Sequence, residues 1–326
     1  ATIVHGAVTD GPVDVRIVDG TIAEVSQSLA AGDAEVVDLA GWILLPAAVE
    51  PHAHLDKAFL AEHVENRTGD LAGAIDAMIA MGDLITFDDI VERAERAARL
   101  MAANGYVAVR THADTNEFGG LRNVEALVEV RRRVADVIDV EIVALTGTPA
   151  AGPAGAQHRA LLRDAIAAGA DLVGGCPHLE DHVEGQRAVE RATDVFLDVA
   201  ADAGVGLDLH TDETLDPDVM GLEYLADQVL AGFPNPVTAS HCVSLGQRSA
   251  REQAATADLV AAADISVVAL PHTNLFLQGR GRAPMPRALT AVDALLRAGV
   301  NVAAGADNLQ DPFNPVGRAC PFETAG

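Results

Sequence analysis

The stretch ILLPAAVEPHAHLDK, residues 43–57, passes from an apolar run into two histidines and the only lysine of the chain. The apolar run, residues 43–51, is predicted to be a β-strand that opens the main body of the protein. Alternate side chains of a strand share one face, so His52 and His54 are expected to point the same way and to bind one metal ion. Lys57 stands alone among 22 lysine and arginine residues. Its presence suggests a role that arginine cannot fill, such as a compact ammonium donor, although chance placement is the alternative.

Downstream of this strand, apolar segments alternate with amphipathic segments, which is the pattern of parallel strands joined by helices. Glycines such as Gly105 and Gly204 fall just before predicted strands, where glycine commonly ends a helix. Eight strands in strict alternation with helices predict a TIM barrel, the (β/α)8 fold. The predicted strands are 43–51, 106–112, 139–145, 171–176, 205–210, 236–241, 265–271 and 300–306, and the predicted helices are 87–103, 121–135, 156–168, 185–203, 217–231, 247–263 and 286–298.

The first 45 residues follow a different pattern, in which short apolar runs alternate with turns. Asp19-Gly20 is predicted to form a hairpin turn between two of these runs. We therefore expect a small β-domain over residues 1–45 and a barrel domain over residues 46–326. The chain ends about twenty residues after the last predicted strand, so the closing helix of the barrel is expected to be missing or very short.

The composition excludes several classes of partner. A net charge of −26 at pH 7 would repel nucleic acid and anionic membranes. The three cysteines are far apart in the sequence and form no CxxC motif, which favours free thiols in a reducing cytoplasm. We expect neither a signal peptide nor a membrane span, because no charged-then-apolar segment stands at the start and no run of 18 apolar residues occurs. The expected partner is a small molecule, and a homo-oligomer is left open.

Catalytic side chains of a TIM barrel lie at the carboxyl ends of its strands. Seven of the eight predicted strand ends carry histidine or aspartate, and seven of the 11 histidines lie there. Scattered core or surface histidines would not gather at one end of the strands. The side chains concerned are His52, His54, His112, His178, His210, His241, His272 and Asp307. For His112, His178 and His272, a role in supporting metal ligands and a role as hydrogen-bonded loop histidines are equally open.

A metal centre is predicted from four of these side chains, namely His52, His54, His210 and Asp307. Nitrogen and oxygen ligands suit Zn²⁺ or Fe²⁺, and water bound to such an ion has its pKa lowered towards about 7. One ion is expected, because binuclear hydrolases of this fold often use a carboxylated lysine on a middle strand, and Lys57 lies just past the first strand. Cys176, near the fourth strand, could add a ligand, but a buried, inert cysteine is the favoured interpretation.

Two further residues are candidates for proton chemistry. Glu213 follows His210 by three residues and is predicted to carry protons from the water to a leaving nitrogen. The alternative is an acid at a helix N-terminus, where the helix dipole favours negative charge. His241 is expected to orient the attacking water or to bond a substrate oxygen, and Asp307 to help hold that water.

Motifs along most of the chain together resemble the amidohydrolase superfamily, in particular its cytosine deaminase branch. They include PHAHLDK at 51–57, VRTH at 109–112, AGADLVG at 168–174, HTDE at 210–213, ASH at 239–241, NLFLQGR at 274–280 and GADNLQDP at 305–312. The resemblance implies a distorted TIM barrel and a β-sandwich built from both termini, whose C-terminal part we expect to be missing here. It implies one metal ion with the ligand set His52, His54, His210 and Asp307. It also implies Glu213 as the proton shuttle, His241 beside the hydrolytic water, and Gln278 near the pocket.

Two departures from the cytosine deaminases concern the substrate. Those enzymes carry a second aspartate directly after the metal-binding aspartate, where this chain has Asn308. They also carry a glutamine after the third strand, where this chain has Thr146-Gly147-Thr148-Pro149. An asparagine can donate hydrogen bonds as well as accept them. Asn308 is more similar to members that hydrolyse N-alkylated triazines such as N-isopropylammelide.

We therefore expect a mononuclear metal-dependent hydrolase that removes ammonia or an amine from a nitrogen heterocycle other than cytosine. Lys57, Gln278 and Asn308 are the candidate substrate contacts, and Lys57 has bracing of its own loop as a second possible role. An amidase or cyclic amide hydrolase of the same superfamily is the first alternative. A non-catalytic metal-binding or ligand-binding barrel is the second, and it is disfavoured because binding alone needs no proton shuttle.

Overall fold

The computed structural model describes residues 2–8, 12–82, 84–180 and 184–326. The chain forms two compact units, Ala1–Ala47 and Ala48–Gly326. Across the described part of the chain, none of the helices combines the length and the apolar character that a bilayer span requires.

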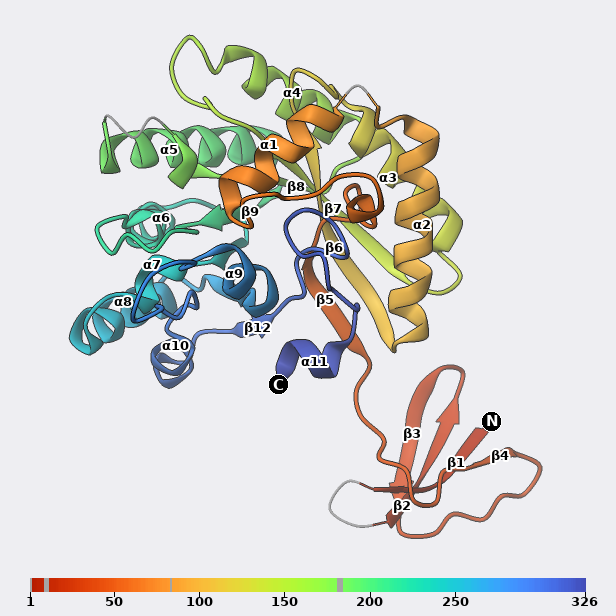
Figure 1. Cartoon of the computed structure of the whole chain (residues 1–326). Coiled ribbons are helices and arrows are strands. Elements are labelled where there is room, and N and C mark those ends of the chain that lie inside the picture. The colour runs from red at the N-terminus through yellow and green to blue at the C-terminus, as the bar shows by residue number, and fades with distance from the viewer. Residues whose placement is uncertain (1, 9–11, 83, 181–183) are drawn as a thin grey trace. The chain divides into compact units, whose positions relative to one another are not determined.

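The first unit is built around one four-stranded sheet in the order β3-β2-β1-β4 (Figure 1). Its strands are β1 (Thr2–Val8), β2 (Pro12–Val18), β3 (Thr21–Ser26) and β4 (Glu35–Asp38). β2 pairs antiparallel with β1 and β3, whereas β4 runs parallel to β1. Asp19 and Gly20 have φ angles of 50° and 75°, as the predicted hairpin turn between β2 and β3 requires. The sequence did not predict β4, which is short and exposed at every residue.

The second unit is an eight-stranded parallel barrel in which the strands follow the chain order from β5 to β12 (Figure 1). β5 and β12 are the two edges of the hydrogen-bonded sheet, and an isolated parallel bridge between Ala53 and Asp307 connects them. The predicted TIM barrel is therefore confirmed, in a nearly closed form. Its strands are β5 (Ala48–Ala53), β6 (Tyr106–Thr115), β7 (Asp139–Thr146), β8 (Leu172–Gly175), β9 (Gly206–Thr211), β10 (Val237–His241), β11 (Ser266–Ala269) and β12 (Val302–Ala304).

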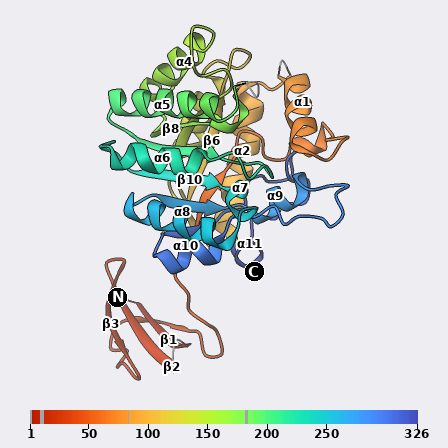
Figure 2. The same ribbon diagram turned by 90° about the vertical axis from the view of Figure 1, so that its left-hand side faces the viewer.

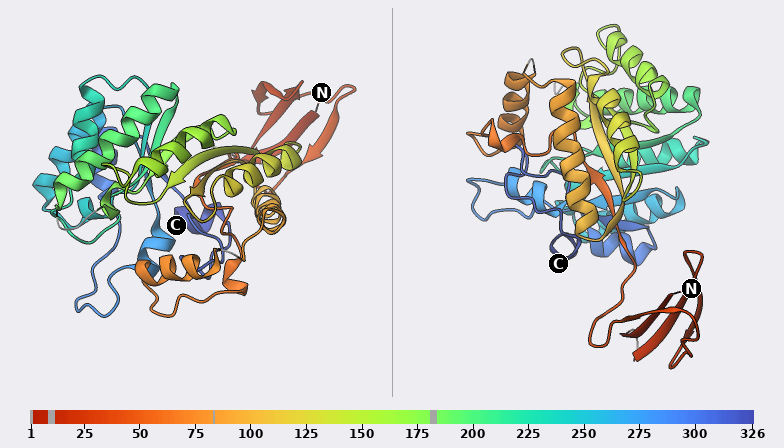
Figure 3. Two further views of the ribbon diagram at one scale, coloured as in Figure 1. Left: turned by 90° about the horizontal axis from the view of Figure 1, so that it is seen from above. Right: turned by 90° about the vertical axis from the view of Figure 1, so that its right-hand side faces the viewer.

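Amphipathic helices cover the outside of the barrel. α2 and α3 pack on β6 and β7 (Figure 3), and Figure 2 shows α4, α5, α6, α8 and α10 following one another along the opposite side. In α2, buried Ile90, Ala94 and Met101 recur at helical spacing, and Thr86 caps the N-terminus. The helices between strands are α2 (Phe87–Ala103), α3 (Arg122–Val134), α4 (Ala156–Ala167), α5 (Gln186–Ala203), α6 (Gly221–Leu230), α8 (Ala250–Ala262) and α10 (Val292–Ala298).

Several elements differ from the sequence prediction. β5 begins at Ala48 rather than at residue 43, because residues 43–47 belong to the first unit and pairing with β6 starts at Ala48. After β12 the described chain forms one short helix, α11. The helices that were not predicted are α1 (Leu71–Met81), α7 (Val243–Gly246), α9 (Pro271–Leu277) and α11 (Pro321–Ala325), together with the 3₁₀ turns Leu60–Glu62 and Pro177–Leu179.

Candidate metal centre and catalytic site

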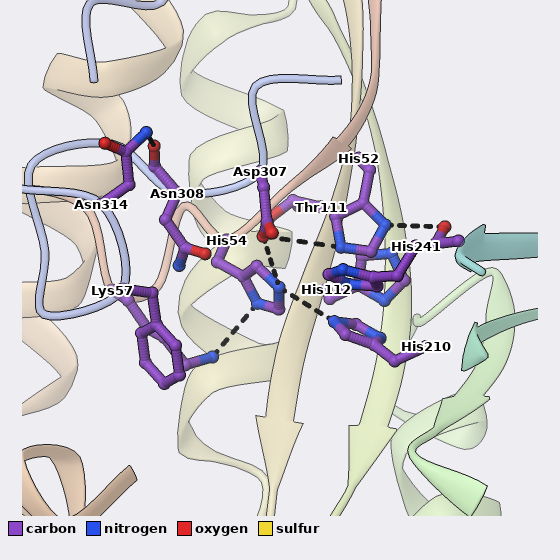
Figure 4. Close-up of polar contacts among 12 residues, drawn as sticks. His52, His54, Lys57, Thr111, His112, His210, His241, Asp307, Asn308 and Asn314 are labelled. Atoms are coloured by element: carbon purple, nitrogen blue, oxygen red, sulfur yellow. Dashed lines mark hydrogen bonds and ion pairs between the residues drawn. The ribbon is translucent and has the colours of Figure 1, made fainter. Parts of the chain in front are cut away.

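Four side chains from three separate segments meet at the carboxyl end of the barrel (Figure 4). β5 carries His52 and is followed by His54, β9 carries His210, and Asp307 follows β12. Nε2 of His54 lies 3.2 Å from Nε2 of His210 and 3.3 Å from Oδ1 of Asp307. Nε2 of His52 lies 3.7 Å from the same carboxylate oxygen. All four side chains are buried, so these predicted ligands form one cluster.

The backbone places Asp307 against β5. Its N–H donates to the carbonyl of His52 at 3.0 Å, and its own carbonyl accepts from the N–H of His54 at 3.2 Å. These two bonds hold Asp307 in the left-handed region, with φ of 63°, which is uncommon outside glycine. The buried carboxylate of Glu50 reinforces the junction, because Oε1 accepts from the N–H groups of His52 and Ala306. Burial raises the pKa of Glu50 to about 8.

The donor atoms of the cluster fit a divalent metal ion. Nε2 of His52 and Oδ1 of Asp307 are buried without a hydrogen-bond partner in the described part of the chain, although buried polar atoms normally have one. Each of His52, His54 and His210 offers a nitrogen, and these atoms lie within 4.8 Å of one another. Burial first, and then neighbouring histidines, hold the pKa of His52 and of His210 well below the usual range. Neutral imidazoles with a nearby carboxylate are ligands that Zn²⁺ and Fe²⁺ take.

Lys57 connects His54 to a further carboxylate. Its ammonium donates to Oδ1 of Asp114 at 2.7 Å and lies 3.2 Å from Nδ1 of His54. Burial opposes the charge of Lys57, but Asp114 and then Asp56 outweigh burial and raise its pKa. The ammonium of Lys57 is a donor, so Nδ1 of His54 is the acceptor in this contact.

Asn274, on α9, joins Glu213 to His241. Its Nδ2 donates to Oε1 of Glu213 at 3.0 Å and lies 3.1 Å from Nδ1 of His241. Burial, and then Asp307, raise the pKa of Glu213 well above its ordinary value. Burial lowers the pKa of His241 to about 4, so this imidazole is neutral at pH 7. A carboxyl group with a raised pKa beside a neutral imidazole can take up and return a proton.

A cavity of about 480 Å³ opens onto this cluster. Its metal-side wall includes His54, His210, Glu213, His241 and Asp307. The apolar part of the lining includes one face of α1, with Leu71, Ile75, Met78 and Ile79. Lys57, Asp114 and Asn308 add polar groups to the lining. Pockets of about 300–1,000 Å³ bury drug-sized ligands, so the cavity accommodates more than one small ring.

The two predicted amide contacts occupy different places. Asn308 lines the cavity, and its Nδ2 donates to Oδ2 of Asp311 at 2.7 Å, which fixes the orientation of the amide. Gln278 lies behind Glu213, where its Nε2 is 3.4 Å from the carbonyl oxygen of that residue. The residues that line the cavity do not include Gln278.

The three histidines whose roles the sequence left open lie in different places. The ring centroid of His112 lies 4.0 Å from that of His52, and Nδ1 of His178 donates to the carbonyl of His210 at 3.0 Å. Both therefore pack around the predicted ligand histidines, whereas His272 lies in the first turn of α9 and does not line the cavity. Cys176 does line the cavity, and burial raises the pKa of its thiol, so a neutral thiol is present there.

Sequence reasoning missed Asn274, Asp114, Ser240 and Asp208 as site residues. Asn274 belongs to the segment 274–280 that supported the family resemblance, but an amide carries no proton chemistry and was not singled out. Asp114 lies on β6 two residues after His112, on the same face of the strand, and this spacing was an available signal. Ser240 and Asp208 each precede a predicted site residue in the sequence, and only the pairing of β9 with β10 shows that they meet.

Comparison with known proteins places this site in a family. Residues 62–326 match the amidohydrolase family described as Amidohydro_3. A pterin deaminase from Rhizobium rhizogenes is 34% identical over 95% of this chain and 70% of its own length. The structure of a 5-methylcytosine deaminase from Klebsiella pneumoniae superposes with a TM-score of 0.87 at 30% identity, covering 99% of this chain and 78% of that one.

A second solved structure gives a similar result. The N-isopropylammelide isopropylaminohydrolase from Burkholderia multivorans superposes with a TM-score of 0.81 at 29% identity, covering 99% of this chain and 79% of that one. The match to the family spans most of the barrel and includes His210, Glu213, His241 and Asp307. The chain therefore belongs to the amidohydrolase family.

Proposed function

We propose that this amidohydrolase is a mononuclear, metal-dependent deaminase that hydrolyses a carbon–nitrogen bond on a nitrogen heterocycle and releases ammonia. The observation that carries the proposal is the meeting of three imidazoles and a carboxylate beside the Glu213–Asn274–His241 group in one cavity. Relatives at about 30% identity that deaminate pterin or 5-methylcytosine support the same reaction class.

Each residue of the site has its own role in the proposed reaction. His52, His54, His210 and Asp307 would hold one divalent ion, which would make a water molecule a better nucleophile at neutral pH. Glu213 accepts one proton from that water as its oxygen bonds to the ring carbon, and gives this proton to the ring nitrogen. It then takes the second proton from the new hydroxyl group and gives it to the exocyclic amine. The bond between the ring carbon and that amine breaks, ammonia leaves, and a carbonyl remains. His241 stays neutral and, with Asp307, orients the water.

The cavity favours a two-ring substrate. Pterins are 2-amino heterocycles with two fused rings, and a cavity of about 480 Å³ with an apolar wall accommodates such a ring system. Asp114 offers a carboxylate that can accept hydrogen bonds from ring N–H and amino groups. We therefore place pterins first among the substrates to be tested.

A second candidate is the removal of an alkylamine from a triazine. Asn308, with its amide fixed by Asp311, and the likeness to the N-isopropylammelide enzyme favour it. The same ligand set and the same Glu213 would serve both reactions, because only the leaving amine differs.

Zn²⁺, with Fe²⁺ as the alternative, is the proposed ion, since both accept imidazole and carboxylate ligands. A cytoplasmic location rests on the cysteine usage. The absence of nucleic-acid and membrane partners rests on the net charge.

The test is a substrate panel with the purified, metal-loaded protein and separate detection of ammonia and alkylamine. The panel holds pterins, cytosine, N-alkylated triazines and cyclic amides. The expected result is ammonia release from a pterin. Alkylamine release from a triazine would favour the second candidate, and ring opening of a cyclic amide without ammonia would replace deamination by amide hydrolysis. No turnover of any compound by protein that holds its metal would contradict both candidates.

A further inference from the structure

A buried chain of hydrogen bonds runs from His52 away from the cavity. Nδ1 of His52 lies 2.9 Å from Oγ of Ser240, and Oγ of Ser240 donates to Oδ1 of Asp208 at 3.1 Å. Arg110 donates from Nη1 to Oδ2 of Asp208 at 2.8 Å and from Nε to Oε2 of Glu141 at 2.6 Å. His52, Ser240 and Asp208 are each fully buried. Five strands of the barrel, β5, β10, β9, β6 and β7, thus contribute one residue each to this chain of hydrogen bonds.

Only one assignment of donors and acceptors fits this chain of hydrogen bonds. The guanidinium of Arg110 only donates, and an ionised carboxylate only accepts. Oδ2 of Asp208 accepts from the guanidinium of Arg110 at 2.8 Å, and this ion pair favours the ionised carboxylate. The hydroxyl of Ser240 has one proton, and it goes to Asp208. Ser240 must therefore accept from Nδ1–H of His52, which leaves the lone pair of His52 on Nε2, facing Asp307.

We propose that Ser240 and Asp208 are positioning residues that hold His52 in the tautomer that binds the metal ion. This inference rests on the proposed function only in taking His52 as a ligand. Second-layer partners of a ligand histidine typically change metal affinity about 10- to 100-fold when they are lost. The position of the histidine proton is what such a partner controls.

His52 differs from His54 in this respect. Nδ1 of His54 faces the ammonium of Lys57, a donor, so this contact does not hold the lone pair of His54 on Nε2. Nδ1 of His52 faces an acceptor, so Nε2 is free of a proton before the ion arrives. His52 is therefore the ligand that is prepared for the metal in advance, and Ser240 is the residue that prepares it.

A competing interpretation uses the same atoms. His52, His112 and Asp208 also form a buried group whose ligand atoms lie within 4.8 Å of one another, which could itself hold an ion. Nδ1 of His52 would then bind a metal and could not donate to Ser240. The two interpretations differ in the number of ions and in the effect of replacing Ser240.

The experiment measures the apparent Kd of the metal by chelator competition at neutral pH, without substrate. We expect Ser240→Ala to weaken Zn²⁺ binding about 10- to 100-fold, with thermal unfolding of the metal-free protein little changed. Asp208→Asn should also weaken metal binding. The amide of the introduced asparagine can donate to Oγ of Ser240, which would reverse the direction of the hydrogen bonds from residue 208 to His52. Ser244→Ala is the matched control, since Ser244 is buried nearby but donates to the carbonyl of Val219. Nitrogen NMR shifts of His52 should show protonated Nδ1 in the metal-free wild type.

Unchanged affinity in both Ser240→Ala and Asp208→Asn would overturn the proposal, as would an equal loss in Ser244→Ala. A wild-type protein with two ions, one of which is lost in Asp208→Asn, would establish the competing site instead. This experiment uses no substrate. A protein that deaminates none of the tested heterocycles would therefore contradict the proposed function without changing the outcome of the metal-binding test.

Discussion

At the scale of single residues, Glu213 is the group on which the proposed reaction depends. It lies in the cavity wall with Asp307, and burial and that neighbour raise its pKa, so it holds a proton more readily than an exposed glutamate does. Asn274 fixes Oε1, which directs the carboxyl group relative to His241. Because its pKa is raised, a larger fraction of this carboxyl group is protonated near neutral pH. The second half of the reaction, in which it donates a proton, requires that form.

We expect Glu213→Gln to lower kcat at least about 100-fold, because glutamine keeps the hydrogen bond from Asn274 but cannot take up or return a proton. Metal content should stay at one ion per chain. Steady-state kinetics with parallel metal analysis checks both statements, and Glu223→Gln on α6, outside the cavity lining, is the control. Near-normal turnover in Glu213→Gln would remove this residue from the mechanism.

The sequence singled out several individual residues of the candidate site. His52 and His54 stand out because two histidines flank one alanine at a strand end, and Glu213 because it follows His210 by three residues. Asp208 carries no such local signal, since its partner Arg110 comes from another strand. A role that arises from pairing between strands cannot be inferred from spacing along one strand.

At the scale of elements, α1 shapes the cavity. Ala74 and Ala77 on one face are buried, and Leu71, Ile75 and Met78 on another face line the cavity. Because both faces are apolar, the segment lacks the polar stripe that marks an amphipathic helix, and the sequence did not predict it. α9 was missed because its seven residues span fewer than two full repeats of a helical pattern.

We expect Ile75→Ala to raise the KM for a two-ring substrate about tenfold, because removal of buried apolar contacts costs about 0.8 kcal/mol per CH₂ group. The kcat should change little, since α1 contributes none of the proposed metal ligands or proton-transfer groups. Asp76→Ala, on the exposed face of α1, is the matched control. An equal KM for wild type and Ile75→Ala would show that substrate does not contact this helix.

At the scale of the whole molecule, the barrel brings together segments that the sequence separates widely. Parallel strands in chain order carry His52, His210 and Asp307 to one end, and the bridge between Ala53 and Asp307 closes the gap between the first and last strands. This arrangement was predictable because strict alternation of strands and helices specifies a parallel barrel, and a parallel barrel gathers the carboxyl ends of its strands. The exact neighbours of each ligand were not predictable, since they depend on register and on loops such as the one that carries Asp307.

Anomalous diffraction from crystals of the metal-loaded protein tests the central claim most directly. We predict one metal peak, at about 2.0–2.2 Å from Nε2 of His52, His54 and His210 and from a carboxylate oxygen of Asp307. Two peaks, or one peak between Nδ1 of His52, His112 and Asp208, would contradict it.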